Sequence, residues 1–153
     1  MSVLNRLREL GLELPAIPEP VGNYVPCVRV GDLLFLSGQG PWRDDKWMCL
    51  GSVDTEVTLE QAYDAAKVCA LGTLAVMQRE LESLDKVNKI VRVTGYVNSD
   101  RSFRHQPKVL NGASDIFERV LGDRGRHARS AIGVTSLYHN ISVEIDVIAQ
   151  VTM

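Results

Sequence analysis

An arginine and a glutamate in the last part of the chain are the residues whose types and spacing best suit chemistry. Arg129 starts a short extended run, 129–134, and Glu144 lies inside a second run, 142–151. Because the two runs are close in sequence, we expect them to pair as neighbouring strands and to bring the two side chains together. An arginine can grip a small carboxylate, and a nearby glutamate can activate a water molecule. The pattern therefore predicts a site for small carboxylate ligands.

A basic cluster around the same arginine would allow a different chemistry. Arg124, Arg126 and His127 precede Arg129 and could bind RNA, with the histidine as general acid or base. However, the chain has a formal net charge of −2 at pH 7, and no aromatic stacking platform accompanies the cluster. We therefore expect a small molecule rather than nucleic acid as the ligand, with RNA cleavage as the rival enzymatic interpretation.

Neither the histidines nor the cysteines follow a common metal-ligand spacing. The cysteines also lack the even number and the close spacing of a disulfide framework, which indicates reduced thiols. We therefore predict no metal site and a cytoplasmic location. The residues concerned are His105, His127, His139, Cys27, Cys49 and Cys69.

Length and composition favour a single domain over residues 1–153, because a chain of this size with 45% apolar residues can bury one substantial core. No apolar run approaches the roughly 20 residues that cross a bilayer, so we expect no membrane association. The segment 1–20 should form a short helix and a proline-rich connector, with Ser2 as the helix cap and Gly11 as its end. The inner face of this helix would carry Leu4, Leu7 and Leu10.

Two segments with apolar residues at helical spacing indicate the helices that must position the site. Apolar residues at helical spacing follow the capping-box pair Thr58 and Gln61, and a second helical pattern runs from Pro107 to Gly122. The order ββαβαββ then predicts an α+β fold with two helices on one face of a sheet. The predicted strands cover 24–30, 33–37, 90–97, 129–134 and 142–151, with a hairpin turn at 31–32 and a surface loop at 38–47.

Alternation along the last strand separates an apolar face from a polar one, and Glu144 belongs to the polar face. Its side chain should therefore point away from the helices. Ile132, Val134 and Ile148 make parts of this second face apolar, which favours its coverage by another subunit. We expect a homo-oligomer with sites at its interfaces. The apolar face comprises Val143, Ile145, Val147, Ala149 and Val151.

Segments throughout the chain resemble the YjgF/Rid family, also described as endoribonuclease L-PSP, in its YjgF/chorismate-mutase-like branch. The resemblance is carried by segments 21–25 and 33–39, then by Asn111, and then by the segments around Arg129 and Glu144, in the order of the family. It implies a chorismate-mutase-like fold and a homotrimer that closes a barrel of sheets, with clefts between subunits. The best-defined members hydrolyse enamines and imines to a 2-oxo acid and ammonia, a reaction that would need no organic cofactor.

The same resemblance implies roles for individual residues. Arg129 would bind the substrate carboxylate, and Glu144 would orient or deprotonate the attacking water near the reacting carbon. Tyr24 would lie at the mouth of the cleft, Ser37 would bond the carboxylate, and Asn111 would support the site. Ordinary structural roles compete with these, because the arginine and the glutamate could form an ion pair and the other three could serve in packing or backbone bonding.

One position departs from the family pattern. Many deaminating relatives have a cysteine two residues after the arginine, where this chain has Ala131. A thiol cannot be required here, although the neighbouring backbone amide and carbonyl could still position water. The substitution keeps a non-catalytic alternative open, in which a trimer binds a small carboxylate through Tyr24, Ser37 and Arg129 and signals its presence to a partner protein.

Overall fold

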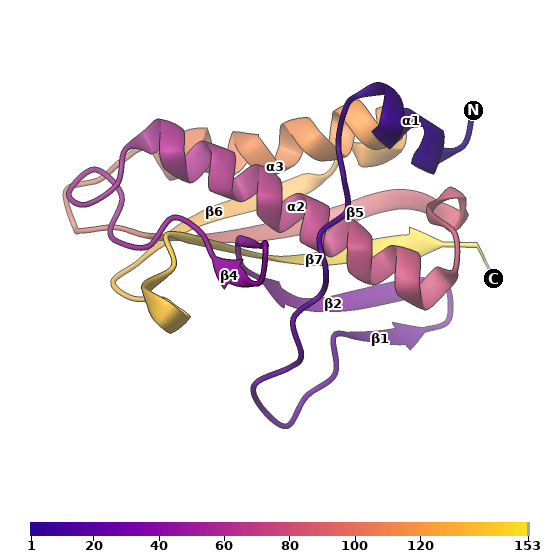
Figure 1. The fold of residues 1–153 in the computed structure, drawn as a ribbon, viewed down its shortest axis with the longest axis horizontal. Helices are drawn as coiled ribbons and strands as arrows, with labels where there is room; N and C mark the ends of the chain where they lie inside the picture. The colour runs from indigo at the N-terminus through magenta and orange to yellow at the C-terminus, as the bar shows by residue number, and fades with distance from the viewer. Residues whose placement is uncertain (153) are drawn as a thin grey trace.

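A mixed five-stranded β-sheet with helices on one face forms the centre of the computed structural model, which describes residues 1–152 (Figure 1). Its strands are β1 (Cys27–Val30), β2 (Leu33–Gln39), β5 (Val87–Asn98), β6 (Ala128–Val134) and β7 (Val143–Val151). They lie in the order β1-β2-β7-β5-β6, and all neighbours are antiparallel except β5 and β6. The predicted α+β class is confirmed.

The longer of the two covering helices, α2 (Leu59–Leu81), starts where the capping pattern places it. The Gln61 amide donates to the Thr58 hydroxyl at 3.0 Å, and the Thr58 amide donates to the Gln61 side chain at 2.9 Å. This reciprocal pair satisfies donors that the first turn would otherwise leave free, so the predicted capping box is confirmed.

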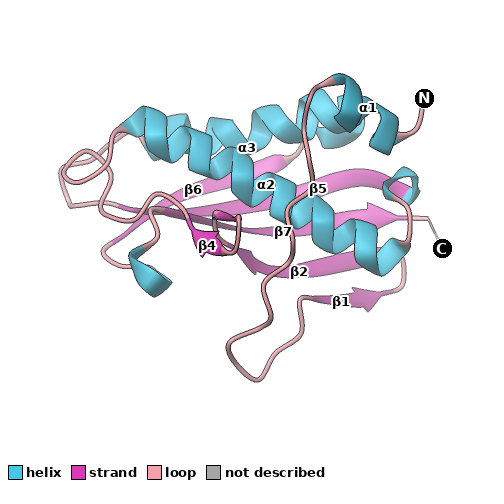
Figure 2. Cartoon of the chain, viewed as in Figure 1, coloured by secondary structure: helices cyan, strands magenta, loops and turns pink. Residues whose placement is uncertain are grey.

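The second covering helix, α3 (Gln106–Leu121), has Pro107 in its first turn and Gly122 at its C-terminal end, as predicted. It lies beside α2 on the same face of the sheet (Figure 2). Its backbone approaches α2 closely at Gly112, where a Cβ atom would overlap the carbonyl group of Tyr63. Glycine at this crossing therefore allows the two helices to pack together.

The N-terminal helix α1 (Val3–Glu9) is capped by the side chain of Ser2, as predicted. Its inner face differs from the predicted one, because Val3 is buried while Leu4 is 38% exposed. The Val3 amide donates to Asp85 Oδ1 at 2.9 Å. This contact ties the first turn of α1 to a distant part of the chain and turns Leu4 outward.

A small hairpin occupies part of the segment 38–47, which the sequence pattern predicts to be a surface loop. β3 (Trp42–Arg43) pairs with β4 (Lys46–Trp47) in antiparallel fashion. Asp44 and Asp45 form the turn, with φ angles of 53° and 57° that a two-residue hairpin of type I′ requires. The loop prediction is wrong at these positions, because strands of two residues are too short to show an alternating pattern.

Short 3₁₀ helices occur in the connections between the main elements. They are η1 (Leu84–Lys86), η2 (Gly122–Gly125) and η3 (Tyr138–Asn140). Across residues 1–152, no helix combines the length and the apolar character that crossing a membrane requires.

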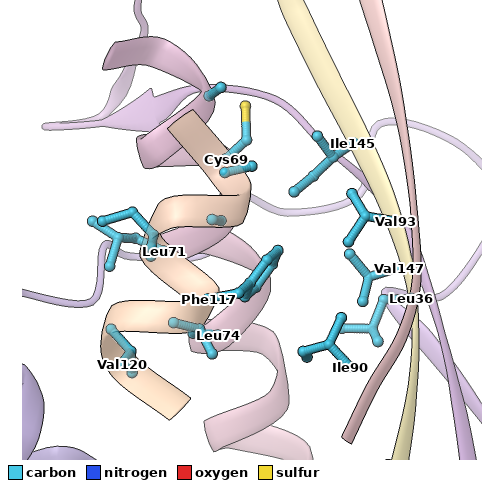
Figure 3. Close-up of a cluster of buried hydrophobic side chains, with 14 of the residues drawn as sticks. Leu36, Cys69, Leu71, Leu74, Ile90, Val93, Phe117, Val120, Ile145 and Val147 are labelled. Atoms are coloured by element: carbon cyan, nitrogen blue, oxygen red, sulfur yellow. The ribbon is translucent and has the colours of Figure 1, made fainter. Parts of the chain in front are cut away.

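The hydrophobic core lies between the two long helices and the inner face of the sheet (Figure 3). Phe117 of α3 and Leu74 of α2 are buried against strand residues such as Val93 and Val147. Burial of one such side chain contributes about 1.5–3 kcal/mol to folding. The predicted inner face of β7 is buried along its whole length, so the side chain of Glu144 belongs to the opposite face.

The order of the strands contradicts one prediction about the site. β6 pairs with β5 in parallel and forms an edge of the sheet, whereas β7 lies between β2 and β5. The strands that carry Arg129 and Glu144 are therefore not neighbours. The reason is the crossover through α3, which places β6 beside β5, since parallel strands need such a helical connection. Closeness in sequence did not decide which strands pair.

Candidate functional site

The guanidinium of Arg129 is held by the first half of α3. Nη1 donates to Asn111 Oδ1 at 2.9 Å and to Ser114 Oγ at 3.0 Å, and Nη2 donates to the Pro107 carbonyl at 3.3 Å. Within residues 1–152, none of the ion pairs includes Arg129. A guanidinium has five N–H groups, so Nε and Nη2 each keep one for a ligand. The arginine is thus fixed in place while its charge is unpaired within the described chain.

Ser114 extends this network to His127. The Ser114 Oγ atom lies 2.9 Å from His127 Nε2, and His127 Nδ1 lies 2.6 Å from the Gly125 carbonyl oxygen. Because a carbonyl can only accept, Nδ1 carries a proton. Burial lowers the pKa of His127 below its usual value, and the charge of Arg129 lowers it further. The imidazole is therefore neutral at pH 7, and its Nε2 accepts the hydroxyl proton of Ser114.

Ala131 completes the group of residues around the arginine. It follows Arg129 on the inner face of β6, lies opposite Gly95 of β5, and is half-buried against the core. Its methyl group offers no chemistry, so only backbone groups are available at this position. We refer to Asn111, Ser114, His127, Arg129 and Ala131 as the arginine cluster.

The predicted residues Tyr24, Ser37 and Glu144 come together at a second place. They line an open hollow of about 690 Å³, which we call the glutamate hollow. Tyr24 lies before β1 rather than inside it, because the strand begins only at Cys27, and the residue is 53% exposed. The other residues that line the hollow are Val21, Gly22, Leu36, Gly38, Tyr138 and Asp146.

An irregularity at the end of β2 shapes the glutamate hollow. The pairing of β2 with β7 shifts register shortly before Gln39, so Ser37 and Gly38 lie in a bulge. The Ser37 hydroxyl donates to the Val25 carbonyl at 2.7 Å, which fixes the bulge to the preceding segment. Gly38 faces Glu144 so closely that a Cβ atom there would overlap the carboxyl group. The absence of a side chain at Gly38 therefore makes room for the glutamate.

The carboxyl group of Glu144 has a perturbed ionisation. Burial raises its pKa, and the carboxylate of Asp146 on the same face of β7 raises it further. Asp146 in turn accepts a hydrogen bond from the Tyr96 hydroxyl at 2.9 Å. A glutamate with a raised pKa exchanges its proton closer to neutral pH, which suits general acid and base catalysis.

The arginine cluster and the glutamate hollow lie on opposite faces of the sheet. Arg129 contacts α3, which covers the inner face, whereas Glu144 alternates with the buried Val143 and Ile145 and points the other way. The predicted meeting of Arg129 and Glu144 within one chain is therefore wrong. No ion pair joins them within the described residues.

The side chains of the basic patch are engaged inside the chain. Arg124 donates to the backbone carbonyl of Val87 at 2.9 Å, and Arg126 forms an ion pair with Glu118 at 3.4 Å. The histidine and the arginine at the end of the patch belong to the arginine cluster. Among residues 1–152, no group of three or more His, Cys, Asp or Glu side chains is arranged to hold a metal ion.

Ser114, Gly38 and Tyr138 are among the residues of these two groups that the sequence analysis does not predict as site residues. Ser114 could have been found from its position three residues after Asn111, which places both side chains on one face of a helix. Gly38 could have been found as a glycine at the end of a strand, where bulges and close approaches are common. No sequence pattern indicates Tyr138, which the connection before β7 brings to the hollow.

Comparison with known proteins places these features in a family. The family model described as "YjgF/chorismate_mutase-like, putative endoribonuclease" matches residues 4–149. The chain is 40% identical to Protein TCP17 of Trypanosoma cruzi, over 97% of this chain and 93% of that protein. It is 27% identical to a 2-iminobutanoate/2-iminopropanoate deaminase of Dermatophagoides farinae, over 88% of this chain and 91% of that protein.

Solved structures share the fold. A "putative endoribonuclease" from Shewanella oneidensis superimposes with a TM-score of 0.96 at 30% identity, covering 99% of this chain and 100% of that one. E. coli TdcF, solved with bound serine, has a TM-score of 0.64 at 20% identity, with coverages of 89% and 94%. The family match spans nearly the whole chain. The protein therefore belongs to the YjgF/chorismate mutase-like family.

Proposed function

We propose that the protein hydrolyses small 2-imino acids to 2-oxo acids and ammonia. The observation that carries the proposal is the guanidinium of Arg129, which α3 holds in place without a carboxylate partner among residues 1–152. The N–H groups left on Nε and Nη2 suit the two oxygens of a substrate carboxylate. The deaminase relative supports the same class of ligand.

In the proposed reaction, Arg129 orients the substrate and Glu144 takes a proton from the attacking water. A C–O bond forms at the imine carbon while the electrons of the C=N π bond move to nitrogen. Glu144 then returns the proton to this nitrogen. The C–N bond breaks and ammonia leaves, while the hydroxyl group becomes the carbonyl and passes its proton to Glu144, which releases it to the departing ammonia or to solvent. A protonated imine is already electrophilic, so placement of charges and water supplies most of the catalysis. The scheme uses no metal or organic cofactor.

The proposal requires two chains, because the arginine cluster and the glutamate hollow face opposite ways in one chain. We propose a homotrimer in which the edge strand β6 of one chain brings its arginine cluster to the glutamate hollow of the next. Apolar side chains on the helix-free face of the sheet support its burial between chains. They are Val28, Val30, Phe35 and Ile132, which are 51%, 61%, 43% and 42% exposed in the single chain.

The direct test measures ammonia and 2-oxobutanoate from 2-iminobutanoate, which a threonine dehydratase generates in the assay. We expect the protein to accelerate this hydrolysis. Arg129→Ala should lose on the order of 2–5 kcal/mol of substrate stabilisation, because a buried charge contact is removed. Arg8→Ala, which removes an exposed arginine that contacts only Asn5 on α1, is the matched control and should behave as wild type. Equal rates for Arg129→Ala and wild type would refute the proposal.

A second variant separates hydrolysis from simple carboxylate sensing. Glu144→Gln removes the proposed base but keeps the size of the side chain. A hydrolase should lose turnover and keep its affinity for 2-oxobutanoate, measured by calorimetry. A wild-type protein that binds 2-oxobutanoate without accelerating imine hydrolysis would instead support the sensing alternative.

RNA cleavage is not favoured as the function, because Arg124 and Arg126 are both bonded within the chain.

We also infer a cytoplasmic location. The free thiols of Cys27, Cys49 and Cys69 support it, since the cytoplasm keeps cysteines reduced.

A further inference from the structure

We propose that Ser114 and His127 are positioning residues that hold the carboxylate-binding guanidinium of Arg129 in its working orientation. The inference rests on the proposed function for the identity of the ligand, and on the hydrogen bonds of the chain for everything else. Neither residue would touch the substrate. They would act through Arg129.

The hydrogen bonds of the network run in one direction. His127 donates from Nδ1 to the Gly125 carbonyl, which leaves Nε2 as an acceptor. The only proton available between Nε2 and Ser114 Oγ is that of the hydroxyl, so Ser114 donates to the imidazole. The lone pairs of Ser114 then remain for Arg129 Nη1, which donates to them at 3.0 Å. The Gly125 carbonyl thus determines which group donates and which accepts in each hydrogen bond from His127 to Arg129.

The surroundings of His127 maintain this direction. The imidazole and the ring of Phe117 form a T-shaped pair, with the centroids 5.8 Å apart. The charged groups near it are Arg129 on β6, Lys89 on β5 and Glu118 on α3. Burial is the largest influence and lowers the pKa of His127, and the two cations lower it further. The hydrogen bond to the Gly125 carbonyl and the charge of Glu118 raise the pKa, but they do not outweigh the burial and the cations, so the ring is neutral at neutral pH.

The network also determines which N–H groups Arg129 can offer. Asn111 and Ser114 together occupy both N–H groups of Nη1, so the guanidinium cannot rotate without breaking one of these bonds. Loss of Ser114 would leave Asn111 as the sole side-chain partner of Nη1, and loss of the acceptor on His127 would free the Ser114 hydroxyl to turn away from the guanidinium. The guanidinium would then sample several orientations, and carboxylate affinity would fall while the proton transfer at Glu144 continued.

The first measurement is made on ligand-free protein, so it does not depend on the proposed function. We expect the ¹⁵N resonances of His127 to report a proton on Nδ1 and none on Nε2 at neutral pH. Ser114→Ala and His127→Leu should both change the side-chain resonances of Arg129. His127→Gln, whose amide oxygen can accept the Ser114 proton, should restore them. A proton on Nε2 in the wild type, or unchanged Arg129 resonances in both variants, would overturn the inference.

The second measurement tests the consequence for the ligand. Ser114→Ala and His127→Leu should raise KM for 2-iminobutanoate and the Kd for 2-oxobutanoate by about tenfold or more, with little change in kcat, because a bond to a charged group is lost. Ser114→Thr and His127→Gln should recover most of the affinity. His105→Gln is the control, since His105 is exposed and makes no side-chain cap bond at the start of α3.

The two measurements distinguish failure of the inference from failure of the proposed function. Unchanged affinity in Ser114→Ala and His127→Leu, in a wild type that binds 2-oxobutanoate, would refute the positioning role. A wild type that neither binds 2-oxobutanoate nor hydrolyses the imine would refute the proposed function. The resonances of ligand-free Arg129 would still decide between a held and a free guanidinium.

Discussion

Glu144 and Arg129 are both held in place by neighbours that carry no charge, while the carboxylate of Asp146 raises the pKa of Glu144 without contacting it as an ion-pair partner. Gly38 leaves space for the carboxyl group of Glu144, and Asn111 and Ser114 hold the guanidinium of Arg129. Charged partners would neutralise the two groups, whereas these neighbours only orient them. Substitutions at these neutral neighbours can therefore displace Glu144 or Arg129 without changing the charge of either.

Gly38→Ala tests this arrangement at the glutamate. The added methyl group would overlap the carboxyl group, so Glu144 must move away from its place in the hollow. We expect kcat/KM for 2-iminobutanoate to fall by about tenfold or more, because small misplacements of a catalytic group are costly. In a Glu144→Gln background the same alanine should cost no further activity. Full activity of Gly38→Ala with a native circular dichroism spectrum would contradict the prediction.

His127 should also make the stability of the protein depend on pH. The folded state holds the pKa of His127 below its ordinary value of 6.5, whereas the unfolded chain titrates near that value. Between the two values the unfolded state binds more protons, so lowering the pH through this window destabilises the fold. Urea unfolding at fixed protein concentration, from about pH 7.5 to about pH 5.5, should show a smaller loss of free energy for His127→Leu than for wild type. Equal slopes would exclude this contribution.

The individual elements follow from local rules to a large extent. The capping pair Thr58 and Gln61 marks the start of α2 correctly, and Pro107 and Gly122 mark the two ends of α3, because these signals act within one turn. The β3 and β4 hairpin could not be predicted, since strands of two residues carry too little pattern. Which face of α1 packs inward also depended on a distant contact, the bond from Val3 to Asp85.

The crossing of α2 and α3 provides a prediction at the scale of elements. Gly112→Ala should destabilise the protein by about 1–3 kcal/mol, because the new methyl group would meet the backbone of Tyr63. Helix propensity alone predicts the opposite sign. Gly72→Ala in α2 is the matched control, since its methyl group would make only an ordinary contact with Gln39, and it should not destabilise. Denaturant unfolding of both variants checks the sign.

Pairing of the strands is where prediction of the site failed. The types of Arg129 and Glu144 and the outward direction of Glu144 are readable from alternation along each strand. Their relation in space depends on β5, which lies between their strands and is distant from both in sequence. The role of Ser114 arises only where α3 packs against β6, although its helical spacing from Asn111 could have indicated that both side chains share one face. Local patterns thus identified the residue types of the site, whereas tertiary contacts determined that Arg129 and Glu144 lie on opposite faces of the sheet.

At the scale of the molecule, the proposed trimer makes each site depend on two chains. Arg129→Ala and Glu144→Gln should each abolish activity alone. If the two inactive proteins are unfolded together and refolded as a mixture, about a quarter of the sites would combine an intact arginine with an intact glutamate, assuming random assembly of a closed ring. We expect that share of wild-type activity to return. No recovery in a mixture that forms trimers would contradict a shared site.

The helix-free face gives a second prediction at this scale. Ile132→Lys places a charge on exposed apolar surface at the edge of the sheet, where it is 42% exposed in the single chain. Burying it between subunits would be costly, so the variant should lose the oligomer and with it the activity. Light scattering coupled to size exclusion measures the mass directly. Thr135→Lys, at an exposed position just after β6, is the matched control.

The two edges of the sheet have a consequence for how the protein must be handled. Both β1 and β6 end the sheet, and each has an outer row of backbone groups that no other strand within residues 1–152 pairs. An unassembled chain therefore offers two templates for strand addition beside an apolar face, the combination that promotes aggregation. Assembly and aggregation would compete for the same surface during synthesis and refolding. Slow dilution from denaturant should favour the native oligomer. In Ile132→Lys, the charge on the edge strand β6 should also reduce aggregation of the unassembled chain.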